Sequence, residues 1–304
     1  MSQTVNAASE PRPQLVSFSS GDGSVVGHLY LPAGHDPAKR YPAVVVGGSF
    51  ASVKEQMGDI YAGELARRGV IALAIDYRNY GQSSGALRQY EDPDAKAADL
   101  SAAVAFLKVR SDVSGTGLLG VCTSGGNVLD AAARDGNVSA VATIAGMFTA
   151  PSLQLAMRGA EGMQARMEEG RVAKKTYAQT GVIEIIKAYH DTDQTAANVA
   201  PLPYYFDTAR GAVPAWRNEF AVMAWKAMLD FDPVSAASRV TAPTLIVHSE
   251  GSAFPDQARK THALLAGPKE LYWAEGAHLD FYDQADQVRD AADHVVGHFR
   301  QHLS

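Results

Sequence analysis

Short apolar runs alternate with amphipathic stretches along most of this chain, and that alternation limits the possible folds more than any other feature. Two of the apolar runs, 25–31 and 42–47, are rich in β-branched residues, and two further short apolar runs span 70–76 and 117–122. Stretches with apolar residues at helical spacing span 54–68, 95–110 and 123–135. Strands buried on both faces of a parallel sheet have this composition, and the crossovers between them place helices on the sheet. The pattern predicts a mainly parallel sheet with helices on both faces.

The two ends of the chain complete the predicted sheet. Runs 13–18 and 25–31, joined by a turn at 21–23, predict an antiparallel hairpin at the start. Near the end the alternation returns, with strand-like runs at 243–248 and 270–273 and helical stretches at 255–265 and 284–303. We expect eight strands in all.

The alternation breaks between residues 150 and 230. This segment is rich in Met, Ala, Gln and Glu and contains no clear strand pattern, so it is predicted to be a helical insertion over one end of the sheet. The predicted organisation is a core domain of residues 1–149 and 231–304, interrupted by a helical cap, or lid, of residues 150–230.

Composition and charge exclude several kinds of partner. The 304 residues carry a formal net charge of −6 and no polybasic run, which argues against nucleic acid and against a membrane surface. No apolar run approaches the ~18 residues of a membrane span, and the polar first residues lack the layout of a secretory signal. We expect a cytoplasmic protein with a small-molecule substrate, and a homodimer is compatible with it. One cysteine and scattered histidines form no metal-binding pattern, so neither metal nor cofactor is expected.

The sharpest chemical signal lies where a buried strand runs directly into a helix, at residues 118–126. Its centre is Cys122, flanked by Gly120 and Ser124. A turn that holds its central residue in a strained conformation requires small residues about two positions away. Such a turn projects the central side chain above the sheet at a helix N-terminus, whose N–H groups favour a thiolate. Cys122 is therefore predicted to be a nucleophile.

Two other interpretations of this segment stay open. Ser124 also satisfies the spacing of small residues within 122–126, but as the nucleophile it would need the strand to run two residues further and would leave Gly120 unexplained. A free cysteine can also be a small buried hydrophobic residue without a chemical role.

The pattern of Gly120, Cys122, Ser124 and Gly125 resembles the dienelactone-hydrolase-like branch of the α/β-hydrolases, in which Cys replaces the usual Ser. The likeness extends over nearly the whole chain, through residues 53–56, 76–78, 81, 83 and 216–218. The resemblance implies an α/β-hydrolase fold and hydrolysis of a carbonyl substrate.

A general base is expected in the loop 275–281, after the last strand, where His278 is the best of nine histidines. The acid of a catalytic triad is harder to place. Relatives in this branch carry an Asp four residues after the His that ends the seventh strand, and here that position is Ser252. Glu250 is the candidate acid from the same strand end, and Asp256 is a weaker one.

An oxyanion hole needs two N–H donors. One is predicted to be the N–H of Thr123, next to the nucleophile, and the other the N–H of Ser49 or Phe50 in the loop after the third strand. Glu55 has two interpretations. It complements a helix dipole in a first turn, and the resemblance to dienelactone hydrolases, which hold a Glu near the resting cysteine, implies a catalytic alternative.

The lid carries aromatic and thioether side chains that suit a binding pocket. They are Tyr204, Tyr205, Phe206, Trp216, Phe220, Met223 and Trp225. Most of them are expected to pack the lid onto the core, whereas Tyr204, Trp216 and Arg217 are, together with Glu55, candidate substrate contacts. Arg217 is the candidate partner of a substrate carboxylate.

The function predicted from these residues is cysteine-dependent hydrolysis of a small ester, lactone or thioester through an acyl-cysteine. The alternative is a protein of the same fold without hydrolytic turnover, such as a lyase, a cyclase or a binding protein. Ser252, at the position of the usual acid, keeps that alternative open.

Overall fold

The computed structural model describes residues 11–304 and contains a mixed eight-stranded sheet with the order β1-β2-β4-β3-β5-β6-β11-β12. The strands are β1 Gln14–Ser20, β2 Gly23–Tyr30, β3 Tyr41–Gly47, β4 Ile71–Asp76, β5 Val113–Val121, β6 Ala140–Ile144, β11 Thr244–Gly251 and β12 Lys269–Ala277. β2 pairs antiparallel with β1 and with β4, and the remaining pairs are parallel. The predicted hairpin, the strand number and the mainly parallel sheet are confirmed.

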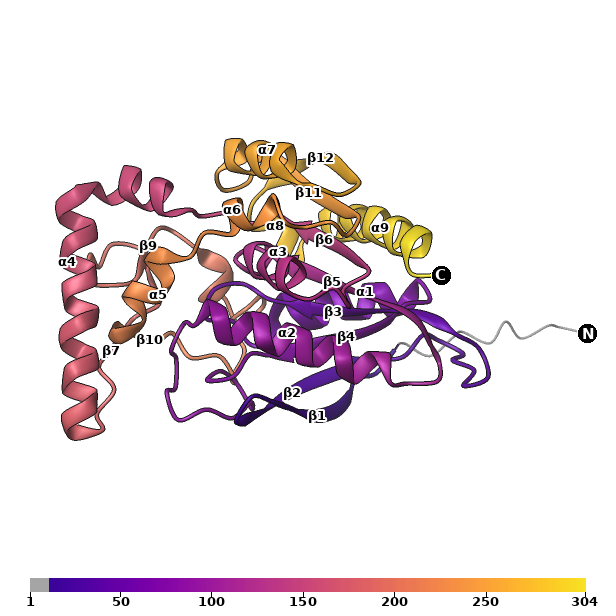
Figure 1. Ribbon diagram of the computed structural model, residues 1–304, viewed down its shortest axis with the longest axis horizontal. Coiled ribbons are helices and arrows are strands. Elements are labelled where there is room, and N and C mark those ends of the chain that lie inside the picture. Colours follow the sequence, from indigo (N-terminus) through magenta and orange to yellow (C-terminus); the bar gives the residue numbers. More distant parts are fainter. Residues whose placement is uncertain (1–10) are drawn as a thin grey trace, which may run out of the picture.

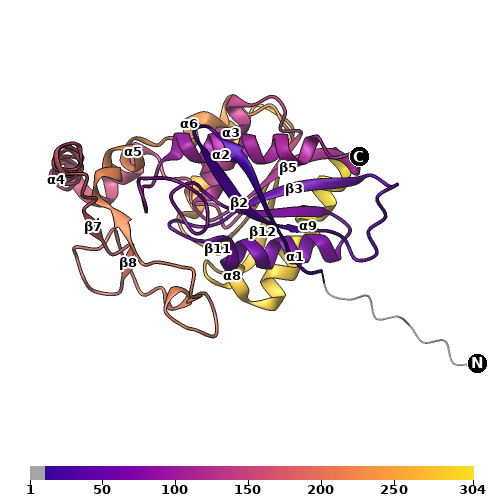
Figure 2. The same cartoon turned by 90° about the horizontal axis from the view of Figure 1, so that it is seen from below.

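Helices cover both faces of the sheet (Figure 2). One face carries α2 Pro93–Lys108 and α3 Ser124–Arg134, and the other carries α1 Asp59–Arg67, α8 Asp280–Asp283 and α9 Ala285–His302. α6 Pro233–Ala237 packs against α3 and α7, and α7 Pro255–Leu264 packs against β11 and β12. Local sequence sets these boundaries. At α2, for example, Asp92 accepts a hydrogen bond from the N–H of Ala95 at 3.0 Å, and Pro93 occupies the first turn.

The segment between β6 and β11 lies to one side of the sheet (Figure 1). It begins with α4 Pro151–Thr180, which is broken at Gly159, where φ is 70°, and ends at Gly181 with φ 72°. The helix α5 Trp225–Asp230 packs against α4. The division of the chain into core and cap domains stays a prediction.

The middle of this segment differs from the expected helical insertion. It contains the two-residue strands β7 Ile185–Ile186, β8 Tyr189–His190, β9 Asn198–Val199 and β10 Phe220–Ala221, and the short 3-10 turns η2 Pro203–Tyr205 and η3 Val222–Ala224. β7 pairs with β10 and β8 with β9. Strands of two residues are too short to show an alternating pattern, so the sequence did not reveal them.

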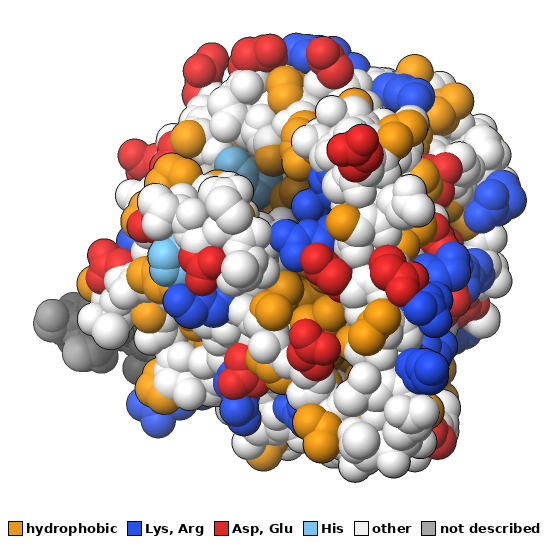
Figure 3. All heavy atoms as spheres, turned by 90° about the vertical axis from the view of Figure 1, so that its left-hand side faces the viewer, with side chains coloured by type: hydrophobic (Ala, Val, Ile, Leu, Met, Phe, Trp, Pro, Cys, Tyr) orange, Lys and Arg blue, Asp and Glu red, His pale blue; other side chains and the backbone are white. Residues whose placement is uncertain are grey.

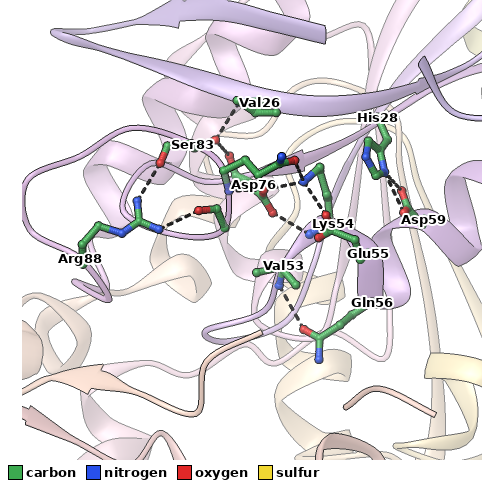
Figure 4. Close-up of polar contacts among 12 residues, drawn as sticks. Val26, His28, Val53, Lys54, Glu55, Gln56, Asp59, Asp76, Ser83 and Arg88 are labelled. Atoms are coloured by element: carbon green, nitrogen blue, oxygen red, sulfur yellow. Dashed lines mark hydrogen bonds and ion pairs between the residues drawn. The ribbon is translucent and has the colours of Figure 1, made fainter. Parts of the chain in front are cut away.

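A buried ionic cluster holds the loops that follow β3 and β4 (Figure 4). The Lys54 ammonium, in the π-helical turn η1 Lys54–Gly58, donates to Asp76 at 2.9 Å, to Glu55 at 2.7 Å and to Gln82 at 2.7 Å. Arg78, two residues after Asp76, bonds Asp99 at 2.6 Å. Removing one member of such a buried cluster leaves an uncompensated charge, so these loops are firmly held.

Within residues 11–304, no helix combines the length and hydrophobicity that crossing a bilayer requires. The cytoplasmic location and the homodimer stay predictions.

Candidate active site

Cys122 stands at the turn between β5 and α3 with φ 57°, a left-handed conformation that non-glycine residues rarely adopt. The tightness of the turn explains its small neighbours. A Cβ on Gly120 would lie 2.2 Å from the carbonyl oxygen of Ser124, and one on Gly125 would lie 2.8 Å from Cα of Gly146. The elbow geometry expected from the spacing therefore centres on Cys122.

Ser124, the alternative nucleophile, lies in the first turn of α3 and is fully buried. Its hydroxyl donates to the carbonyl of Gly48 and lies 2.8 Å from the hydroxyl of Tyr77. Because these contacts hold Ser124 beneath the elbow and it does not line the cavity, its position argues for structural support of the loop after β3.

A cavity of about 520 Å³ opens above the elbow, between the carboxyl ends of the strands and the segment that joins β6 to β11. Cys122, Thr123, Phe50 and His278 all line it. So do three tyrosines, which are Tyr189, Tyr205 and Tyr282. The structure thus brings the candidate nucleophile, base and oxyanion donors to one cavity.

The Cys122 side chain is 3% exposed, and burial raises the pKa of its thiol. The Tyr282 hydroxyl, the Thr123 hydroxyl at 3.6 Å from Sγ, and the backbone N–H groups of Thr123 and Phe50 act in the opposite direction. Burial outweighs these donors and the helix N-terminus, so the thiol is less acidic than the sequence led us to expect.

The same contacts distinguish the two candidates for the second oxyanion donor. The N–H of Phe50 faces the sulfur together with that of Thr123. Ser49 is buried, and its hydroxyl lies 2.6 Å from the hydroxyl of Tyr205. Phe50 is the donor that this geometry favours, and Ser49 positions a tyrosine of the cavity wall.

His278 bonds one partner in the loop after β11 and one in α8. Its Nδ1 accepts a hydrogen bond from the N–H of Ala253 at 3.3 Å, and its Nε2 lies 3.1 Å from the hydroxyl of Tyr282. A backbone N–H can only donate, so the neutral ring carries its proton on Nε2 and donates it to Tyr282. Burial lowers the pKa of His278 to about 4, and the ring is neutral at pH 7.

The carboxylates considered for the triad acid do not reach this ring. Glu250 is 70% exposed and Asp256 is 95% exposed, and both pair with Arg259 on the outer side of α7. Ser252 is buried, with its hydroxyl 2.9 Å from that of Ser249. Successive residues of a strand point to opposite faces, which turns Glu250 outward at the end of β11. In the part of the chain that the structure describes, no carboxylate hydrogen-bonds His278.

The four candidate substrate contacts lie outside the cavity lining. Glu55 accepts from Lys54 in the ionic cluster (Figure 4). Trp216 donates to the carbonyl of Ala51 at 3.1 Å, while Arg217 is exposed and pairs with Glu219 at 2.8 Å. Tyr204 packs edge-on against Tyr205 and Tyr282, 5.1 Å and 5.0 Å away between ring centroids. None of these four residues lines the cavity. Trp216 and Tyr204 pack against residues of the site, and Arg217 lies at the surface.

Tyr282 is the residue of the site that the sequence analysis missed. It contacts Cys122 and hydrogen-bonds His278, so its hydroxyl joins the two. The available signal was its spacing, since Tyr282 follows His278 by four residues and the intervening chain enters α8 Asp280–Asp283, where such a spacing brings side chains together.

An eight-stranded sheet, a cysteine at its elbow and a histidine loop after the last strand define an α/β-hydrolase. No protein-family model matches the chain. The chain is 30% identical to the uncharacterized protein PA2218 of Pseudomonas aeruginosa, over 95% of its own length and 80% of that protein. The crystal structure of PA2218 matches with a TM-score of 0.86 at 27% identity, covering 97% of this chain and 95% of that one.

One further relative and one further solved structure are similar to this chain. Thiohydrolase aneE of Aspergillus aculeatus is 26% identical over 86% of this chain and 84% of its own. The crystal structure of dienelactone hydrolase from Anabaena variabilis shares the fold, with a TM-score of 0.58 at 17% identity, covering 97% of this chain and 100% of that one. The chain belongs to the α/β-hydrolase superfamily, and the resemblance to its dienelactone-hydrolase-like members is confirmed.

Proposed function

We propose that this α/β-hydrolase cleaves a small ester, lactone or thioester through an acyl-cysteine formed on Cys122. The position of that side chain carries the proposal. Cys122 is the strained residue of the elbow, lines the cavity, and has the N–H groups of Thr123 and Phe50 and the hydroxyl of Tyr282 directed at its sulfur. Because one relative is named thiohydrolase aneE, a thioester is the first substrate to test.

The first step joins Sγ of Cys122 to the carbonyl carbon of the substrate. The thiol proton passes to the hydroxyl oxygen of Tyr282 while the proton of that hydroxyl passes to Nε2 of His278. This transfer requires an electron pair on Nε2, so the ring must hold its own proton on Nδ1 and release the N–H of Ala253. Ala253 lines the cavity, and a bound substrate is placed to displace that contact.

The tetrahedral oxyanion accepts hydrogen bonds from the N–H groups of Thr123 and Phe50. When it collapses, the bond to the leaving thiol or alcohol breaks, and the leaving group takes the proton from Nε2 through Tyr282. Water then attacks the acyl-cysteine and gives a proton along the same path. The acid and the free thiol of Cys122 are released.

The pKa shifts favour a mechanism in which the thiol loses its proton at the same time as Sγ attacks the carbonyl carbon. Burial raises the pKa of Cys122 and lowers that of His278 to about 4, so a thiolate–imidazolium pair is disfavoured at rest. The neutral pair is the resting state, and the thiolate forms only as the carbon–sulfur bond forms.

Trapped intermediates test this proposal. We expect hexanoyl N-acetylcysteamine to give an acyl adduct on the wild-type protein, assigned to Cys122 and not Ser124 by fragment mass spectrometry. Cys122→Ser keeps the shape of the site and is expected to lower turnover by about 10³-fold or more, and Cys122→Ala is expected to form no adduct. Full activity in Cys122→Ala would refute the acyl-cysteine mechanism.

One observation favours the second candidate, a protein of this fold without hydrolytic turnover. Nδ1 of His278 accepts from a backbone N–H where a triad would have a carboxylate, so no carboxylate within residues 11–304 stabilises an imidazolium. A lyase, cyclase or binding role is supported if no activated ester acylates the protein and Cys122 does not react with iodoacetamide.

A further inference from the structure

Two arginines of α4 reach the cavity that contains Cys122. Arg158 ends the first part of that helix and Arg166 lies beyond the break at Gly159, and both line the cavity wall. On the face that carries α4, Figure 3 shows basic side chains inside a hollow that has hydrophobic side chains around it.

These arginines give the cavity a positive charge although the chain is acidic overall. Glu91 is the one carboxylate among the cavity-lining residues that the structure describes. It is buried with Lys96, with which it forms an ion pair, and it accepts from the Tyr80 hydroxyl at 2.7 Å. The Glu91 charge is therefore compensated and does not cancel the positive charge of the arginines.

Of the two arginines, Arg158 has the charge that is less neutralised by neighbouring carboxylates. Its Nε donates to the amide oxygen of Gln154 at 3.2 Å, and within residues 11–304 it forms no ion pair. Arg166 pairs with Glu169 at 2.9 Å and donates to the carbonyl of Gln194 at 3.0 Å. Both guanidinium groups lie over the Trp225 ring, at 5.3 Å and 5.0 Å from its centroid.

Burial and the neighbouring Arg166 charge lower the pKa of Arg158. A cation that is partly desolvated beside a like charge gains from an anion more than a solvated one does. Much of the remaining wall is apolar and suits a hydrocarbon chain. It includes Met147, Met157, Leu202, Met228, Phe231 and Phe254.

We propose that the ligand of this cavity combines an apolar chain with an anionic group, a carboxylate or a phosphate, which Arg158 binds. A guanidinium offers two parallel N–H donors to such a group, and Arg166 adds to the attraction from beside it. The inference rests on the proposed function, because it assigns the anion to the substrate whose carbonyl meets Cys122. Arg217, expected to fill this role, is displaced to the surface.

Matched thioesters test the preference. We expect adipoyl N-acetylcysteamine to be hydrolysed with a higher kcat/KM than hexanoyl N-acetylcysteamine, with the difference mainly in KM. The suberoyl and octanoyl thioesters repeat the comparison with a longer acyl chain, in which the anionic group lies further from the carbonyl group. Hexanoyl-coenzyme A against hexanoyl N-acetylcysteamine tests the other source, an anion on the leaving group.

Arg158→Gln is expected to lower the anionic-to-neutral ratio of kcat/KM by about 10- to 100-fold, the effect of removing one charge-assisted hydrogen bond, and Arg158→Lys is expected to restore part of it. Arg171→Gln is the control, because Arg171 is an exposed residue of the same helix that pairs with Glu168 and does not line this cavity. A ratio unchanged in Arg158→Gln, with intact turnover, overturns the anion site and leaves the proposed function standing.

Binding without turnover separates the two proposals. In the Cys122→Ala protein, we expect calorimetry to show tighter binding of adipate than of hexanoate, and the preference to disappear in Cys122→Ala/Arg158→Gln. That result supports the anion site even if no hydrolysis is found. Equal binding of adipate and hexanoate, together with equal turnover of both thioesters, contradicts it.

Discussion

Tyr282 connects the sulfur of Cys122 to the ring of His278, because its hydroxyl contacts both. Its hydroxyl lowers the pKa of Cys122 by donating to the thiolate, against the larger effect of burial. The site therefore consists of hydrogen-bond donors around a sulfur, with a neutral histidine behind them.

Tyr282→Phe tests this arrangement through the reactivity of the thiol. Without the donor the thiolate is less stable, so the pKa of Cys122 rises further and the thiolate fraction falls at every pH below it, about tenfold for each pKa unit. We expect slower alkylation by iodoacetamide at pH 8 and a rate profile shifted to higher pH, followed by mass spectrometry from pH 6 to 10. Tyr204→Phe, a buried neighbour outside the cavity lining, serves as the control. Identical profiles for wild type and Tyr282→Phe would contradict the contact.

At the scale of secondary structure, the elbow depends on β5 and α3 approaching closely at Gly120. A Cβ at this position meets a backbone oxygen at 2.2 Å, and backbone cannot move aside as a flexible side chain can. We expect Gly120→Ala to cost about 1–3 kcal/mol of unfolding free energy and to lower activity, measured by urea denaturation and turnover.

Gly136→Ala is the matched control for the elbow. Gly136 lies in the exposed turn after α3, and an added Cβ there meets nothing within 4 Å. It should leave both stability and activity near those of the wild type. A Gly120→Ala protein as stable and active as this control would show that the elbow tolerates a side chain.

At the scale of the whole molecule, buried neutral histidines link stability to pH. The pKa of His278 is lowered to about 4 by burial, and burial also lowers the pKa values of His248 and His298. The unfolded chain binds these protons near pH 6.5. The contribution of these histidines to the free energy of unfolding is therefore fully present above pH 6.5. It is lost as the pH falls toward the pKa values of the folded state.

The substitution His278→Gln measures the loss of stability that comes from His278 alone, because glutamine does not titrate. Between pH 7 and pH 4.5 we expect the wild type to lose roughly 2–3 kcal/mol more stability than the variant, measured by urea unfolding at both values. His294→Gln, an exposed residue of α9, should lose as much as the wild type. Equal losses in wild type and His278→Gln would show that His278 titrates normally in the folded protein.

The eight strands, the helices between them and the elbow at Cys122 could all be derived from local patterns of the sequence, because strand burial, helical spacing and small residues at a tight turn are properties of neighbouring residues. His278 could be proposed for the same reason, from its place in a loop after the last strand. Local pattern also explains the misses in the lid, where two-residue strands leave no periodic signal.

Only the tertiary structure decided which side chains meet. Glu250 turns to Arg259, Arg217 turns to Glu219, and Arg158 reaches the cavity instead. The acidity of Cys122 and of His278 was likewise set by burial, which for Cys122 outweighs the charge of a helix N-terminus. Contacts and burial depend on segments far apart in the chain, so no local pattern contains them.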